Sequence, residues 1–329
     1  MKAVLWIVAA ICCLLSVEGV GFAGMSRETA DAVRSALNSG HAADALEMLS
    51  SVLTSNPKDA EALNLRCRVY YSEEQWDQAI TACERAVQID TGNSRYHMWL
   101  ARAYGKKAQG LSLMAAYKMA RLIRAEFEAA ANLDPKNGEA LSDLGEFYTE
   151  APTIAGGGYG KAEAVARQLD AISPERALEL RAQIYEQKKD YAAAEKALRA
   201  KISETHLPAQ AWMDLASFYE RRQRWEDMLS ALKAGASAAQ SDHGPAIADG
   251  AAILMKAGRE PRLAIEWMRA YLASNALSEE APAFVVHARI GALLRQLGNS
   301  HDAEVEFAAA RRLARDYPGA ADPERSGNG

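Results

Sequence analysis

The sequence lacks the features that mark most enzymes and nucleic-acid-binding proteins. Its six histidines are scattered without the short spacings of a metal site, and no nucleophile elbow is present. Ser55 and Lys58 have Ser-x-x-Lys spacing, but they flank Pro57 in a turn and no companion motif follows. The net charge of −5 gives no basic excess for binding phosphates. We therefore expect no enzymatic activity, no cofactor, no metal and no nucleic-acid partner.

The glycine-rich stretch EAPTIAGGGYGKAEA, residues 150–164, lacks the pattern of a phosphate-binding loop. Such a loop needs a glycine where Ala155 stands, and a Ser or Thr where Ala162 stands, because that hydroxyl must reach a metal ion. A phosphate-binding loop also follows a buried strand, whereas residues 150–164 follow a helical pattern. The glycines therefore need another explanation.

The N-terminal 23 residues carry one lysine, an apolar run over residues 3–17 and small residues around Ala23. The run is shorter than the ~20 apolar residues that a membrane-spanning helix needs. This pattern predicts a signal peptide at residues 1–23, with cleavage before Gly24 and export to the periplasm. A retained anchor is the alternative.

Beyond residue 24 the alternation that predicts strands is missing, and helical spacing recurs in its place, which predicts an all-α chain. WMDLASFY at residues 212–219 and LSDLGEFY at residues 141–148 share one layout that ends in tyrosine. The closing tyrosine recurs at intervals of 34, 44, 37 and 34 residues. Its positions are Tyr70, Tyr104, Tyr148, Tyr185 and Tyr219. The chain is therefore built from repeats.

A second helix follows each of these, and it opens with a small or flexible residue that permits close helix pairing. These opening positions lie near Ala45, Ala79, Ile123, Ala162, Ala194, Met228, Ala264 and Ala303. The pattern resembles the tetratricopeptide repeat (TPR) family. The resemblance implies a TPR-type α-solenoid of about eight helix pairs over residues 24–317, because one pair cannot bury its apolar face alone. Residues 318–329, with two prolines and no large apolar residue, are predicted to be a disordered tail.

Two units are irregular. In the third, the spacing predicts an over-long second helix from about Leu113 to Leu133, surrounded by basic residues that either form a solvated face or meet an anionic partner or membrane surface. These are Lys106, Lys107, Lys118, Arg121 and Arg124. In the fourth, Tyr148 and Ala162 are 14 residues apart, against 9 from Tyr70 to Ala79.

The extra residues of the fourth unit form the glycine-rich stretch. Pro152 stops the first helix, and four glycines are expected to allow the positive φ angles of an enlarged turn. They are Gly156, Gly157, Gly158 and Gly160. Contact with a small ligand or a partner is the alternative interpretation. The turn also resembles, loosely, one in exported proteins related to the periplasmic TPR component of TRAP transporters.

Two cysteines remain after the predicted signal, Cys67 and Cys83, and they are expected to face one another across one helix pair. An oxidising compartment would let them join. A bridge closing about 16 residues contributes roughly 3 kcal/mol in the chain-entropy model. Two core cysteines that never bond are the alternative.

The resemblance also implies that first helices line a concave groove that binds a protein or peptide. We predict a basic end that receives the partner's acidic part at Arg68 and Arg102, followed by an acidic segment; ordinary solvated charges are the alternative. The groove residues are Asn64, Arg68, Tyr71, Arg102, Lys106, Glu146, Glu150, Gln183 and Glu186. The predicted function is a non-enzymatic scaffold in the cell envelope; a subunit of a solute-uptake complex or a small-ligand carrier is the alternative.

Overall fold

The computed structural model describes residues 24–239 and 244–320. This part of the chain is all-α, with sixteen α-helices, two short 3₁₀ turns and no strand. None of these helices is both long and apolar enough to cross a bilayer. The helices form eight antiparallel pairs: α1 (Arg27–Asn38) and α2 (Ala42–Ser55), α3 (Ala60–Ser72) and α4 (Trp76–Ile89), α5 (Ser94–Ala108) and α6 (Leu113–Leu133), α7 (Gly138–Glu150) and α8 (Tyr159–Leu169), α9 (Pro174–Gln187) and α10 (Tyr191–Glu204), α11 (Pro208–Arg221) and α12 (Trp225–Ala238), α13 (Ala246–Lys256) and α14 (Pro261–Leu272), α15 (Ala283–Gln296) and α16 (Ser300–Leu313).

The eight expected units are confirmed, and the reason lies at the opening position of each second helix. Every residue predicted there is buried, and six of the eight are alanines, whose small side chain leaves little volume between the paired helices. Close approach follows, because the distance between packed helices depends on the side chains at the contact. The over-long second helix of the third unit, α6, spans Leu113–Leu133 as predicted.

Tyrosines link one unit to the next through a repeated hydrogen bond. The hydroxyl of Tyr104 on α5 donates to Glu84 on α4 at 2.7 Å. Tyr148 on α7 donates to Glu128 on α6 at 2.8 Å, and Tyr219 on α11 bonds Glu195 on α10 at 2.7 Å. Each tyrosine ring thus packs in the core while its polar end is satisfied. Three of the five recurring tyrosines of the sequence therefore link neighbouring units.

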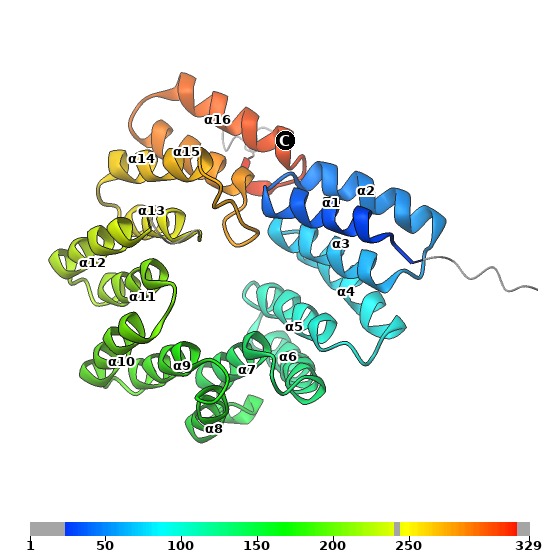
Figure 1. Cartoon of the computed structure of the whole chain (residues 1–329), viewed down its shortest axis with the longest axis horizontal. Helices are drawn as coiled ribbons and strands as arrows, with labels where there is room; N and C mark the ends of the chain where they lie inside the picture. Colours follow the sequence, from blue (N-terminus) through cyan, green and yellow to red (C-terminus); the bar gives the residue numbers. More distant parts are fainter. Residues whose placement is uncertain (1–23, 240–243, 321–329) are drawn as a thin grey trace, which may run out of the picture.

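The solenoid closes into a ring, a closure that no local feature of the chain predicts. Figure 1 shows α15 and α16 beside α1 to α3, with the first helix of each pair facing the centre. Gly40 lies so close to Ala283 that a Cβ atom would overlap the backbone nitrogen of Ala283. We call this contact between the first two units and the last one the seam; its residues are Gly40, Arg68, Glu73 and Gln75 on one side, and Glu279, Ala283 and Asp316 on the other.

The predicted start of the disordered tail was wrong by three residues. Pro318–Ala320 form a 3₁₀ turn that contacts α15 and α16, and Ala320 is fully buried. The ring of Tyr317 meets Phe284 edge-on at 5.0 Å, and Arg311 donates to the carbonyl oxygen of Ala320 at 3.0 Å. Packing therefore continues past the proline that was expected to end it. The predicted signal peptide and residues 321–329 lie outside the described residues.

The expected pairing of the two cysteines is confirmed. Cys67 on α3 and Cys83 on α4 form a disulfide with a Cα–Cα distance of 5.3 Å. Both side chains are fully buried. The bond fastens the helix pair that also carries Arg68 and Gln75 of the seam.

Candidate partner-binding pocket

The enlarged turn of the fourth unit is built by close backbone contacts. Gly156 and Gly158 have φ angles of 97° and 146°, which side-chain-bearing residues rarely adopt. Gly157 packs so tightly on the carbonyl of Ala151 that a Cβ atom has no room. The expectation of a positive φ was wrong for Gly157, which is needed for its close packing instead, and for Gly160, which lies inside α8 rather than in the turn.

Lys161 closes this turn, so it is not free to hold a phosphate. Its ammonium donates to the carbonyl oxygen of Gly156 at 2.8 Å. It also lies 5.1 Å from the ring centroid of Tyr148, a cation–π contact. The Gly-Lys pair that suggested a nucleotide site therefore serves the turn itself.

The second irregularity, α6, meets the glycine turn. Ile123 lies ten residues after the start of α6, whereas the equivalent residue lies three after the start of every other second helix. The difference adds about two helical turns at the N-terminus of α6. The guanidinium of Arg124 packs against Gly156, where a Cβ atom would overlap it. The long helix and the glycine turn thus form one structural feature.

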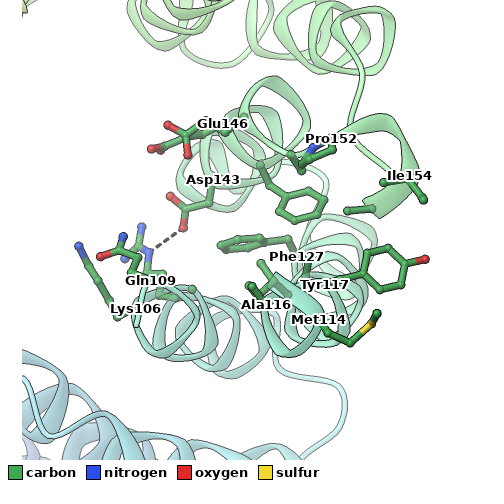
Figure 2. A pocket seen from close by; sticks show the side chains of 18 of the residues that line it. Lys106, Gln109, Met114, Ala116, Tyr117, Phe127, Asp143, Glu146, Pro152 and Ile154 are labelled. Carbon is green, nitrogen blue, oxygen red and sulfur yellow. Dashed lines mark hydrogen bonds and ion pairs between the residues drawn. The ribbon is translucent and has the colours of Figure 1, made fainter. Parts of the chain in front are cut away.

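The helix α6 and the glycine turn, together with α5 and α7, line a cavity of about 880 Å³ (Figure 2). Its apolar wall includes Ile123, Phe127 and Phe147. Met114 and Ile154 stand at its edge and are 70% and 79% exposed, the highest values among large apolar side chains in the described residues. We call this cavity with its edge the pocket.

The polar side of the pocket holds one satisfied pair and three further charges. Arg102 donates to Asp143 at 2.6 Å, and its guanidinium also lies over the ring of Trp99. Lys106, Glu146 and Glu150 line the same side. Within residues 24–239 and 244–320 none of these three is in an ion pair. The pocket therefore presents charges that the chain itself leaves uncompensated.

Glu146 is solvent-accessible, yet its ionisation is perturbed. It lies inside the concavity, where desolvation raises its pKa to about 7, and the nearby charges of Glu150, Asp143 and Glu179 add to this. The ammonium of Lys106 acts in the opposite direction without cancelling the rise. A cation placed beside this carboxyl would favour its ionised form.

The predicted groove residues divide into three groups. Five of them line the pocket, namely Tyr71, Arg102, Lys106, Glu146 and Glu150. Asn64 and Arg68 line a separate polar cavity of about 630 Å³ near the N-terminus of α5. Gln183 and Glu186 line neither cavity, and Glu186 pairs with Arg221 at 2.8 Å.

The predicted basic end of the groove needs correction, because neither arginine is a free cation. Arg68 makes a two-point contact with Glu279 across the seam, with its Nε 3.0 Å from the carboxylate. Arg102 is held by Asp143. Both guanidiniums lie over Trp99, at 5.1 and 4.8 Å from the ring centroid. Both charges are compensated within the chain, so they contribute to helix packing and are not free to bind an acidic partner.

Sequence reasoning missed most of the apolar residues of the pocket and one of its carboxylates. Asp143, Glu146, Phe147 and Glu150 occupy one face of α7, at the spacing of three, four and seven residues that places side chains together on a helix. That spacing could have identified Asp143 and Phe147. Nothing in the sequence could have placed Met114 and Ile154 at the same edge, since the contact between α6 and the glycine turn depends on how that turn folds.

The described residues contain no group of three or more side chains placed to hold a metal ion. Two of the histidines instead pair with carboxylates: His97 with Glu126 and His287 with Glu306, each at 2.6 Å. The bond to Glu126 raises the pKa of His97, partly offset by desolvation. These are structural contacts between the two helices of a pair.

Comparison with known proteins agrees with the helix-pair architecture. A family model described as tetratricopeptide repeat matches residues 36–103. The structure of a thermophilic TPR protein from Thermus thermophilus is similar with a TM-score of 0.50 at 18% sequence identity, over 58% of this chain and 97% of that one. The chain therefore has a TPR-type fold, and residues 36–103 match the tetratricopeptide repeat family.

A tetratricopeptide repeat protein from Parabacteroides merdae ATCC 43184 is similar over 87% of this chain and 92% of its own, with a TM-score of 0.45 and 14% identity. No curated protein matches the chain.

Proposed function

We propose that the protein is a non-enzymatic interaction scaffold that holds a segment of another protein in the pocket between α5, α6 and α7. One observation carries the proposal: the two most exposed large apolar side chains of the described residues, Met114 and Ile154, stand together at the edge of a largely apolar cavity. Exposed apolar residues gathered at one place are typical of interaction sites. TPR proteins as a class bind proteins or peptides, which supports the same function.

The location we propose is the periplasm. The signal-like pattern of residues 1–23 supports export. The disulfide between Cys67 and Cys83 supports an oxidising compartment, since such bonds are rare in the cytosol. Fractionation of cells that produce the full chain tests this: the mature protein should appear in the periplasmic fraction, and recovery in the cytosol contradicts it.

The experiment for the scaffold is capture of the partner from envelope extracts by the mature chain and by the double variant Met114→Glu/Ile154→Asp. Both side chains are exposed, so the changes should leave the melting temperature unaltered. Val305→Asp is the matched control, because Val305 is 57% exposed on α16, far from the pocket. A partner that is retained by the control and lost by the double variant supports the proposal. Equal capture by both variants overturns it.

A small-ligand carrier, including a subunit of a solute-uptake complex, is a second candidate. The observation that favours it is the cavity volume of about 880 Å³, within the range of ~300–1,000 Å³ for small-molecule sites. Native mass spectrometry of the purified protein separates the two. A bound small molecule that disappears from the double variant would establish the carrier.

A further inference from the structure

The pocket has two chemically different ends. Figure 2 shows Lys106, Asp143 and Glu146 on one side, and Met114, Tyr117 and Ile154 on the other. Phe127 lies between them, and Phe147 also lines the pocket. A segment that fills the pocket must therefore offer an apolar group to one end and a polar group to the other.

The charges at the polar end do not balance. Arg102 compensates Asp143 at 2.6 Å. The carboxylates of Glu146 and Glu150 remain, against the single ammonium of Lys106. Glu179 on the neighbouring α9 is a further carboxylate, and the lysine beside it, Lys201, is already paired with it at 2.7 Å. One negative charge is left over when Glu146 is ionised.

The two carboxylates also repel one another. Glu146 and Glu150 are one helical turn apart on α7, and like charges at this spacing destabilise a helix. Lys106 lies on α5 and forms an ion pair with neither of them within the described residues. A cation placed between the two glutamates would relieve this repulsion.

We propose that the partner segment, if it occupies the pocket as the proposed function requires, carries a large apolar side chain beside a lysine or arginine. The apolar side chain lies against Phe127 and Phe147 between Met114 and Ile154, and the cation lies between Glu146 and Glu150. An acidic segment is disfavoured, because Arg68 and Arg102 are already paired. This replaces the acidic partner that the sequence had suggested.

The geometry also sets a pH dependence. The groups that face Glu146 are Glu150 and Asp143 on α7, Glu179 on α9 and Lys106 on α5; Tyr117 of α6 lines the same pocket. The pKa of Glu146 is about 7, so its charge is complete only above neutral pH. Binding of a cationic segment should therefore strengthen between pH 6 and pH 8.

The test uses an immobilised array of hexapeptides in which every pair of amino acids occupies the two central positions. At pH 8 the mature protein should bind peptides with a large apolar residue next to Lys or Arg about tenfold more tightly than those with Glu in that place, equivalent to ~1.4 kcal/mol. The preference should weaken at pH 6.

Two variants separate the inference from the proposed function. Glu146→Gln/Glu150→Gln should abolish the preference for Lys and Arg while keeping the preference for apolar residues. Asp44→Asn/Glu47→Gln, which removes two charges from α2 outside the pocket, is the control and should behave as the unmodified protein. Met114→Glu/Ile154→Asp should lose peptide binding altogether.

The outcomes separate the cation from the pocket. If binding needs Met114 and Ile154 but is indifferent to charge, or prefers acidic peptides, the proposed Lys or Arg in the partner segment is wrong. The proposed scaffold function then still stands. A preference for Lys and Arg that survives in the Glu146→Gln/Glu150→Gln variant also overturns the proposed cation between the two glutamates. If peptides bind equally well to the Met114→Glu/Ile154→Asp variant, or do not bind at all, the pocket is not the binding site. The proposed function and this inference are then both wrong.

Discussion

The seam and the pocket are both places where the ring departs from simple repetition, and they differ in how completely the chain satisfies itself. At the seam Arg68 is matched by Glu279, Gln75 donates to the carbonyl of Asp316 at 3.2 Å, and Gly40 fits backbone to backbone. At the pocket, apolar side chains stay exposed and carboxylates repel. The contacts of the seam are satisfied within the chain, whereas the pocket, where we propose that a partner binds, keeps exposed apolar groups and unpaired charges.

The closeness of the seam predicts the largest effect. Gly40→Ala must adopt a left-handed φ of 74° and also overlaps Ala283, so it should cost about 4 kcal/mol from backbone strain and overpacking together. Gly298→Ala is the control, because its φ is 81° but nothing lies nearby; it should cost about 1–2 kcal/mol. Urea unfolding measures both. Equal losses would show that the seam is open in solution.

The disulfide predicts a somewhat smaller effect in the helix pair that carries the seam. Cys67→Ala/Cys83→Ala should lower the free energy of unfolding by about 3 kcal/mol, from the lost constraint on a loop of 16 residues. Chemical unfolding with and without reductant is the measurement. If reductant leaves the midpoint of the unmodified mature protein unchanged, the bond is not formed.

The repeat architecture could be predicted from the sequence because local patterns determine it. Small residues such as Ala79 and Ala162 recur at related spacings from the tyrosines. Each helix pair can therefore be recognised from its own segment of the sequence. The start of α6 at Leu113 and the pairing of Cys67 with Cys83 follow from the same local spacing.

The seam and the apolar part of the pocket depend on contacts that no local pattern encodes. Arg68 and Glu279 are 211 residues apart in the chain, and only the summed curvature of eight units brings them together. Five of the predicted groove residues line the pocket, because the face of a first helix is a local property. Ile154 was not, because its position depends on how the glycine turn folds back on α6.

The ion pair of the seam predicts a moderate coupling. Arg68 and Glu279 are both mostly buried, so a double-mutant cycle with Arg68→Met and Glu279→Gln should give about 2 kcal/mol. The exposed pair Arg224 and Asp227 is the comparison, and its coupling should be at most about 0.5 kcal/mol. Similar couplings for the two pairs would contradict a closed seam.

We expect the smallest effect on stability from two glutamates whose pKa is raised to about 7 by desolvation. They are Glu73 at the seam, which is 1% exposed, and Glu146 in the pocket. The folded protein keeps these protons between pH 4.5 and 7, while the unfolded chain loses them, so stability falls as pH rises through this window. Glu73→Gln and Glu146→Gln should each raise the melting temperature at about pH 8, and change it little at about pH 4.5.

The two variants should differ in binding. Glu146→Gln should weaken capture of a cationic segment, whereas Glu73→Gln should not, because Glu73 faces Asp316 within the chain. Thermal melts at both pH values, followed by the peptide array, measure the contrast. A loss of capture in Glu73→Gln would mean that the seam, too, takes part in binding.

Site-specific photo-crosslinking in cells tests the central claim most directly. A photoreactive amino acid is placed at Ile154, at Met114 or, as control, at Val305 on α16. We predict that Ile154 and Met114 crosslink to the same partner protein, and that Glu146→Gln/Glu150→Gln reduces the yield while Val305 gives no such product. Crosslinking from Val305 with none from the two pocket positions would contradict the account.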